Sequence, residues 1–246
     1  MNLKTPISLL THSLPCIGGL LKRYDPGLAK GRMQLLFKHK FDPFLTKEGY
    51  KIENKQQLYC YFDFAWEGIV FRGGWQEKLS AKPLILDLGA NYGTFGWICR
   101  KRWPSATIIG FEPMPELAGF CERLGCYDRV YPVALSDSNG TATLFLDYSL
   151  GLTASLGGNP LLSYTSSEMK VETKKLDDYS LTPDFMKVDV DGGELMTIMG
   201  GFKTFKSCPL SVIECTGKQR HKTVKDLLQK KCKKLYVLSG EYLFYD

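Results

Sequence analysis

The sequence contains few of the residue patterns that mark metal or redox proteins. Histidine occurs three times in 246 residues, at His12, His39 and His221, in no recognisable acid-base or ligand arrangement. No Cys-x-x-Cys pair occurs, which argues against a thiolate zinc site. The eight cysteines are Cys16, Cys60, Cys99, Cys121, Cys126, Cys208, Cys215 and Cys232. Free cysteines within apolar segments are typical of a reducing compartment, and we expect a cytoplasmic protein.

The chain also lacks a long uninterrupted apolar segment. The N-terminal apolar stretch, residues 7–21, is interrupted by Thr11, His12, Ser13 and Pro15, so it is too short and too polar to span a bilayer. No small-x-small cleavage site of a secretory signal follows it convincingly. We expect this stretch to pack on the domain as a helix or arm, with contact to a membrane surface as the alternative.

Composition and charge exclude several classes of protein. Hydrophobic residues make up 44% of the chain and charged residues 24%, which excludes a largely disordered or fibrous protein. The net charge of +6 is mild. The basic residues form no stripe interleaved with aromatic residues, and no Asn-Pro-Pro-aromatic motif occurs, so we expect no nucleic-acid partner. We interpret the charge as a solvated face, with attraction to anionic glycans, phosphates or lipid head groups as the alternative.

A change of pattern near Lys82 and Pro83 divides the chain. Residues 1–80 are aromatic and irregular and are expected to form an extension or cap, whereas residues 81–246 alternate strands and helices as in a doubly wound, mostly parallel α/β sheet. Strands are predicted at 84–88, 107–111, 130–135, 185–190 and 210–214, and helices from residues 94, 116, 194 and 223. An antiparallel hairpin, 235–238 with 242–245, is predicted to end the sheet with one reversed edge strand.

The segment 140–182 interrupts this alternation and is rich in Gly, Ser, Thr and Leu. It contains a predicted strand at 141–146 and a loose run at 151–159. Long loops inside compact domains are more often lids or binding loops than filler, so we expect this insertion to border a site.

The most informative pattern is an apolar strand that runs into the turn Asp87-x-Gly89-x-Asn91-x-Gly93. Glycines there let the backbone approach a ligand, and the next helix offers free N–H groups. Glu112 ends the following strand 19 residues beyond Gly93, close to the separation at which an acid binds a ribose diol. The turn lacks the Gly-x-Gly-x-x-Gly spacing, which argues against an NAD-dependent enzyme. The pattern indicates an adenosine-bearing cofactor.

Four blocks occur in order: Asp87-Leu88-Gly89-Ala90-Asn91-Tyr92-Gly93, Phe111-Glu112-Pro113, Ala134-Leu135-Ser136-Asp137 with Gly140, and Lys187 to Glu194 before Gly200. Together they resemble the FkbM family of S-adenosylmethionine-dependent methyltransferases, over roughly residues 65–217. The resemblance implies the Rossmann-like class I methyltransferase fold. Asp191 stands where the family usually has Glu, so the carboxylate is kept but reaches one methylene less far.

The resemblance also implies roles for individual residues. Cofactor-binding residues carried over from it are Asp87, Gly89, Asn91, Gly93, Glu112, Pro113, Ala134, Leu135 and Ser136, with Glu67 as a further candidate. Glu112 would accept hydrogen bonds from both ribose hydroxyls, because an anionic acceptor beside a diol makes charge-assisted bonds. Ala134, Leu135 and Ser136 would lie beside the adenine ring.

Asp189 and Asp191 are the candidates for catalysis, because they follow a predicted strand at the sheet edge where ligands bind in doubly wound folds. They would take the proton from an acceptor hydroxyl, or hold Mg²⁺ or Mn²⁺ together with Glu214. Both lie on one side of the strand if it continues to residue 191. The alternative is that Asp191 and Glu214 cap neighbouring helices. Lys187 is expected to snorkel or to pair with a carboxylate rather than to act in catalysis.

The resemblance implies an S-adenosylmethionine-dependent O-methyltransferase acting on a hydroxyl of a glycan, a sugar or a small molecule. A lipid, polyketide or peptide acceptor is one alternative. A protein that binds the cofactor without turnover, as a scaffold or regulator, is another; the intact Asp87, Glu112 and Asp189 argue against it.

Overall fold

The computed structural model describes residues 43–46, 49–61, 75–147, 153–156, 167–215, 218–229, 235–239 and 242–245. By its residue contacts the chain divides into two units, Met1–Tyr59 and Cys60–Asp246. The domain boundary expected near residue 80 stays a prediction, and the apolar stretch 7–21 lies outside the described residues. None of the helices within these described ranges is long and apolar enough to cross a membrane.

The first unit contains a short hairpin and the start of a helix. Strands β1 (Phe44–Leu45) and β2 (Lys51–Ile52) pair in antiparallel fashion. Helix α4 (Lys55–Tyr61) follows, and the side chain of Asn54 accepts a hydrogen bond from the Gln57 N–H at 2.8 Å, which caps its first turn. Part of the region expected to be irregular is therefore regular structure.

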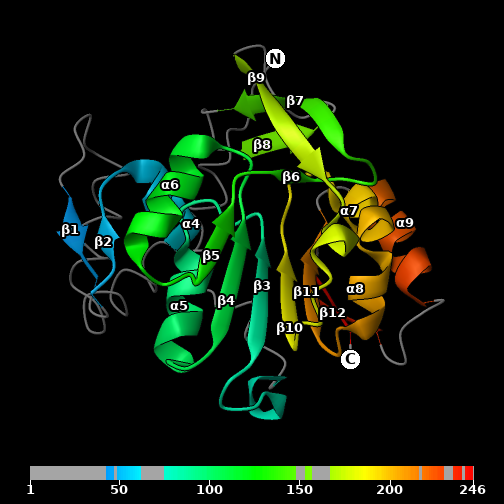
Figure 1. Ribbon diagram of the computed structural model, residues 1–246, viewed down its shortest axis with the longest axis horizontal. Helices are drawn as coiled ribbons and strands as arrows, with labels where there is room; N and C mark the ends of the chain where they lie inside the picture. The colour runs from blue at the N-terminus through cyan, green and yellow to red at the C-terminus, as the bar shows by residue number, and fades with distance from the viewer. Residues whose placement is uncertain are drawn as a thin grey trace, which may run out of the picture. The chain divides into compact units, whose positions relative to one another are not determined.

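The second unit is built on a seven-stranded sheet in the order β12-β13-β11-β10-β3-β4-β5 (Figure 1). Its strands are β3 (Leu84–Leu88), β4 (Thr107–Phe111), β5 (Arg129–Tyr131), β10 (Phe185–Val188), β11 (Ser211–Glu214), β12 (Leu235–Ser239) and β13 (Tyr242–Tyr245). The five strands from β11 to β5 are mutually parallel. This arrangement confirms the mostly parallel α/β sheet of the class I methyltransferase fold.

The C-terminal hairpin is confirmed, but its reversed strand is not at the edge. Strand β13 lies between β11 and β12 and is antiparallel to both. Helix α9 (Lys218–Gln229) separates β11 from β12 in the sequence, and β12 takes the outermost position. The chain then turns back, and β13, the reversed strand, lies between β12 and β11. The expectation of a reversed edge strand was therefore wrong by one position.

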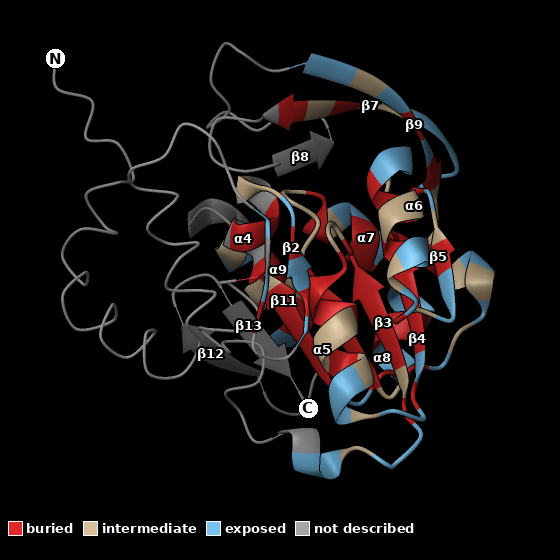
Figure 2. Ribbon diagram, turned by 90° about the vertical axis from the view of Figure 1, so that its left-hand side faces the viewer, coloured by how far each residue is buried: buried red, intermediate tan, exposed pale blue. Residues whose placement is uncertain are grey.

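Helices cover both faces of this sheet. They are α5 (Thr94–Arg102), α6 (Pro115–Leu124), α7 (Glu194–Gly200), α8 (Phe202–Ser207) and α9, with the 3-10 turns η3 (Trp75–Lys78) and η4 (Leu176–Tyr179). Alternate residues of a strand face opposite sides. Thus Ile85 packs with Phe95 of α5, whereas Leu86 belongs to the cluster formed with Ile198 and Val224 of α7 and α9. Figure 2 shows the central strands β3 and β4 almost entirely buried.

A second, four-stranded sheet has the order β6-β9-β7-β8. Its strands are β6 (Ala134–Leu135), β7 (Gly140–Asp147), β8 (Thr153–Leu156) and β9 (Ser167–Lys174). The predicted strand 130–135 is split between β5 and β6, because the chain turns at Val133, whose N–H donates a hydrogen bond to the Tyr131 carbonyl at 2.9 Å. The insertion is likewise not a loose loop, since Thr153–Leu156 pairs with β7. In Figure 1 this sheet lies across the end of the main sheet at which β3, β4 and β10 terminate.

Candidate active site

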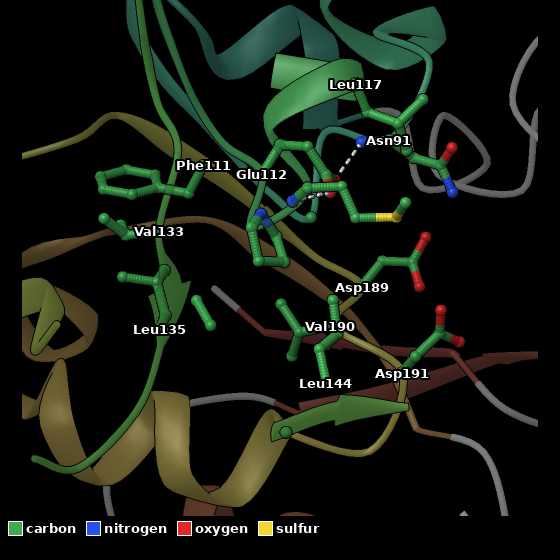
Figure 3. Close-up of a pocket in the computed structure, with 15 residues that line it drawn as sticks. Asn91, Phe111, Glu112, Leu117, Val133, Leu135, Leu144, Asp189, Val190 and Asp191 are labelled. Carbon is green, nitrogen blue, oxygen red and sulfur yellow. Dashed lines mark hydrogen bonds between the residues drawn. The ribbon is translucent and has the colours of Figure 1, made fainter. Parts of the chain in front are cut away.

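An open pocket of about 650 Å³ lies where β3, β4 and β10 end (Figure 3). Its lining residues are Gly89, Asn91, Phe111, Glu112, Pro113, Met114, Leu117, Val133, Ala134, Leu135, Leu144, Asp189, Val190, Asp191 and Gly193. Ligands of open α/β sheets bind outside the carboxyl ends of the parallel strands. The pocket is therefore at the edge that the sequence pattern predicted.

Glu112 is held rigidly in the pocket wall by backbone groups. Its Oε2 accepts a hydrogen bond from the Asn91 N–H at 2.7 Å, and its Oε1 accepts one from the Met114 N–H at 3.0 Å. The side chain is 4% exposed, and burial raises the pKa of Glu112 to about 7. Each carboxylate oxygen has a second lone-pair direction, so the group keeps capacity for ligand hydroxyls.

One end of the pocket is apolar. Phe111, Val133 and Leu135 lie together on one side of Glu112 in Figure 3, and the Phe111 ring stacks on Tyr131 with centroids 5.2 Å apart. Leu144 of β7 brings the second sheet into the lining, which meets the expectation that the insertion borders the site. A slot of this kind suits an aromatic heterocycle.

The polar end of the pocket is backed by a buried lysine. Lys187 is 2% exposed, and its Nζ donates to the Gly89 carbonyl at 2.7 Å. The same Nζ lies 3.2 Å from Asp87 Oδ1 and 3.3 Å from Asp189 Oδ2. Burial lowers the pKa of a lysine, but the carboxylates of Asp189 and Asp87 outweigh it and raise the pKa of Lys187. The expected pairing of Lys187 with a carboxylate is confirmed.

Asp87 lies behind the pocket rather than in its lining. It is fully buried, and Tyr127 donates a hydrogen bond of 2.6 Å from its hydroxyl to Asp87 Oδ2. Burial raises the pKa of Asp87, and the neighbouring Lys187 acts in the opposite direction. Tyr127 was not predicted as a site residue, because it belongs to none of the motif blocks and lies 40 residues from Asp87.

The glycines of the turn bring protein segments together. Gly89 has a φ of 84°, and a Cβ there would collide with the backbone carbonyl of Asp189. A Cβ at Gly93, whose φ is 70°, would lie 3.0 to 3.2 Å from atoms of Leu124, Cys121 and Tyr127. Both glycines therefore let protein segments pack closely, and Gly89 also lines the pocket.

Asp189 and Asp191 both line the pocket, but not because they continue a strand. Strand β10 ends at Val188, and Asp191 has a φ of 45°, so the alternation that was expected to align them does not apply. Asp191 is not the N-cap residue of α7, because Gly193 holds that position.

The three-carboxylate metal site is not formed in the described part of the chain. Glu214 ends β11 but is not among the pocket-lining residues. No group of three His, Cys, Asp or Glu side chains among the described residues is arranged to hold a metal ion. The structure thus brings Asp189 and Asp191 to the pocket without Glu214.

The other predicted site residues divide between the pocket and its surroundings. Those in the lining are Gly89, Asn91, Glu112, Pro113, Ala134, Leu135, Asp189 and Asp191, and those outside it are Asp87, Gly93, Ser136 and Glu214. Glu67 lies outside the described residues. Lining residues that sequence analysis did not select include Met114 and Leu117, which follow Pro113 at the start of α6, and Val190 between the two aspartates.

The chain is 31% identical over 142 residues to the 2-O-methyltransferase NoeI of Sinorhizobium fredii (strain NBRC 101917 / NGR234), covering 50% of this chain and 58% of that protein. It is 35% identical over 86 residues to methyltransferase sdnD of Sordaria araneosa, covering 34% and 28%. The chain thus spans little more than half, or less, of the length of these relatives.

Among solved structures, the METTL16 methyltransferase domain is similar with a TM-score of 0.46 and 11% identity, over 93% of this chain and 91% of that one. The precorrin-6y C5,15-methyltransferase of Geobacter metallireducens GS-15 has a TM-score of 0.42 and 13% identity, over 69% and 81%. The model of the methyltransferase FkbM domain matches residues 87–237, which is more than half of the chain. The chain belongs to the FkbM methyltransferase family.

Proposed function

We propose that this protein transfers a methyl group from S-adenosylmethionine to a hydroxyl oxygen of a glycan, a sugar or another small molecule. The observation that carries the proposal is a single pocket that joins an apolar slot, the fixed carboxylate of Glu112 and the carboxylate of Asp189. Membership of the FkbM family supports the reaction class.

The lining of the pocket fits the adenosine part of this cofactor. Phe111, Val133 and Leu135 offer apolar walls for a base, and Glu112 offers an anionic acceptor for the two hydroxyls of a ribose. Because two backbone N–H groups fix the Glu112 carboxylate, it needs no rearrangement to receive a diol. Glu112 is therefore the residue on which cofactor affinity should depend most.

The choice of oxygen as the methyl acceptor is supported by a relative. The 2-O-methyltransferase NoeI acts, by its name, on an oxygen. In this chain the pocket lining contains carboxylates and apolar groups but neither a cysteine nor a histidine among the described residues. Carboxylates accept hydrogen bonds from hydroxyl groups, so they suit an acceptor with hydroxyls.

Asp189 is the residue that we propose receives the proton of the acceptor hydroxyl. Its side chain is 22% exposed at the pocket, and Oδ2 is tied to Lys187 at 3.3 Å, so the carboxylate is oriented before any ligand arrives. The bound cofactor supplies an electrophilic methyl group, and the bonding electron pair stays on its sulfur. Methyl transfer depends mainly on alignment, and a positioned carboxylate base assists it. Asp189 and Asp191 line one pocket, and no third described His, Cys, Asp or Glu completes a metal-binding group with them.

Calorimetric titration with S-adenosylmethionine and S-adenosylhomocysteine tests the cofactor. We expect micromolar binding that is unchanged by EDTA, Mg²⁺ or Mn²⁺, and a Glu112→Ala variant that binds at least tenfold more weakly. Turnover is then followed with methyl-labelled cofactor against glycans, simple sugars, and lipid and peptide hydroxyls. Absence of binding of both ligands would overturn the proposal, and loss of binding on adding EDTA would reinstate a metal site.

A further inference from the structure

We propose that the Asp189 carboxylate makes this pocket bind the positively charged cofactor, S-adenosylmethionine, more tightly than the uncharged thioether product, S-adenosylhomocysteine. The inference rests on the proposed function, because it takes the pocket as the cofactor site. It adds a property of that site, discrimination between reactant and product by charge.

The arrangement of the lining residues sets the direction in which a bound nucleoside points. In Figure 3, Phe111, Val133 and Leu135 lie on one side of Glu112, and Asp189 and Asp191 lie on the other. A base among the apolar side chains and a ribose at Glu112 leave the 5′ carbon directed away from the apolar end. The sulfur of the cofactor is attached to that carbon, so its charge lies on the side of the two aspartates.

Carboxylates set the charge on that side of the pocket. Lys187 Nζ is shared between Asp87 at 3.2 Å and Asp189 at 3.3 Å, so one positive charge stands against two negative ones. Lys187 is itself 2% exposed and is not a lining residue. The described lining includes Glu112, Asp189 and Asp191 but no Lys, Arg or His. The surface that faces a ligand there is therefore negative, although the whole chain carries a charge of +6.

The size of the effect depends on the dielectric around the charges. The methyl-sulfonium carries one positive charge that the thioether lacks, and the two molecules are otherwise nearly the same. Attraction between a positive charge on the ligand and a negative charge about 6 Å away raises the affinity roughly threefold in a water-like dielectric. In the dielectric typical near a protein surface, it raises the affinity roughly a hundredfold. Asp189 is partly exposed, so we expect a ratio of at least about fivefold.

This property has a consequence for product release. When the hydroxyl proton moves to Asp189 as the methyl group moves to the acceptor oxygen, the sulfonium and the carboxylate both lose their charges. The attraction between them then disappears, and the product binds less tightly than the next cofactor molecule. The protein is expected to be only weakly inhibited by S-adenosylhomocysteine.

Calorimetry tests the inference without any acceptor. The ligands are S-adenosylmethionine, S-adenosylhomocysteine, and sinefungin, in which an ammonium group replaces the methyl-sulfonium. In the unmodified protein we expect both cationic ligands to bind at least fivefold more tightly than the thioether. In Asp189→Asn we expect the ratio to fall below about twofold through weaker binding of the cations, while the affinity for the thioether stays within about twofold.

Asp226→Asn is the matched control, because Asp226 is exposed on α9 and lies outside the pocket lining, so the same charge is removed elsewhere. This variant should keep the ratio of affinities between the cationic ligands and the thioether.

The salt dependence of binding tests the inference without a variant. Added salt should reduce the affinity for the two cationic ligands more than the affinity for the thioether. Equal affinities in the unmodified protein, or an unchanged ratio in a folded Asp189→Asn, overturns the inference alone. If no ligand binds the unmodified protein, the proposed function fails instead.

Discussion

Lys187 and Asp87 form a 3.2 Å ion pair whose side chains are 2% and 0% exposed. The two residues are partners in register on the adjacent parallel strands β10 and β3. Each strand continues into a loop that lines the pocket, at Gly89 and at Asp189. The pair therefore ties together the two loops that carry the polar end of the site. Removing one partner of such a buried ion pair strongly destabilises a protein, because the other charge is left buried without its partner.

The first prediction is that Lys187→Met lowers the free energy of unfolding by about 3 to 5 kcal/mol. The double variant Asp87→Asn with Lys187→Met should recover part of that loss, because it leaves no charge at the fully buried position 87 and the introduced amide keeps an acceptor for Tyr127. The charge of Asp189, which also loses its lysine partner, is partly exposed to solvent. Urea unfolding followed by circular dichroism measures both. Lys174→Met is the control, since the ion pair of Lys174 with Glu172 is largely exposed and its loss should leave stability nearly unchanged. Equal effects at 187 and 174 would contradict this account of the buried pair.

A second prediction concerns Gly200, the last residue of α7. A Cβ there would collide with the backbone carbonyl of Ser136, beside the pocket-lining Leu135. Gly200→Ala must displace backbone, so we expect it to destabilise the protein by about 1 to 3 kcal/mol and to weaken cofactor binding.

Gly119→Ala in the middle of α6 is the matched comparison for Gly200→Ala. The atom nearest to an added Cβ there is at the end of a flexible side chain, Arg123 Nη1 at 3.2 Å. This change should stabilise the helix by about 0.5 to 1 kcal/mol. Thermal unfolding measures the stability of both variants. If Gly200→Ala leaves the stability unchanged, β6 can move away from α7.

The features that the sequence predicted well are those encoded by neighbouring residues. Apolar runs marked β3 and β4 with their observed bounds, and the acid after β4, Glu112, lies in the pocket wall. The order of strands at the C-terminal end was predicted less well, because pairing of β13 with both β11 and β12 depends on contacts between distant segments. The prediction that Asp189 and Asp191 lie on one side of a continuing strand was wrong, because the backbone at Asp191 enters the left-handed region at a φ of 45°.

The second layer of the site could not be predicted from local pattern. Tyr127 reaches Asp87 only because its ring lies against Gly93, Gly96 and Gly110, at each of which an added Cβ would meet it. Gly93 and Gly96 lie at the start of α5 and Gly110 lies in β4, and nothing in the spacing of the sequence links them to a tyrosine. Asp87 itself was expected at the ligand, but its burial places it behind Gly89 as a support for Lys187.

A third prediction follows from the raised pKa of Glu112, about 7 in the folded protein against 4.5 for an ordinary glutamate. The folded state holds the proton more tightly than the unfolded state, so between pH 4.5 and 7 the free energy of unfolding falls as the pH rises. The total loss attributable to this group is about 3 kcal/mol. Urea unfolding of the unmodified protein and of Glu112→Gln at pH 5 and pH 8.5 measures it. The free energy of unfolding of Glu112→Gln, relative to that of the unmodified protein, should be higher at pH 8.5 than at pH 5. A difference between the two proteins that does not change with pH would contradict the raised pKa of Glu112.

The same titration makes cofactor binding depend on pH in the opposite sense. The ribose hydroxyls are bound best by the ionised Glu112, so the ligand must displace the proton that the free protein holds below pH 7. Affinity for S-adenosylhomocysteine should therefore increase towards tenfold per pH unit between pH 5 and 7 and level off above it. This ligand is chosen because its uncharged sulfur is indifferent to Asp189. Calorimetry at pH 6 in two buffers with different ionisation enthalpies should show the release of close to one proton. Glu112→Gln should bind about tenfold more weakly at pH 8 and release no proton, and proton release that persists in this variant would assign the titration to another group.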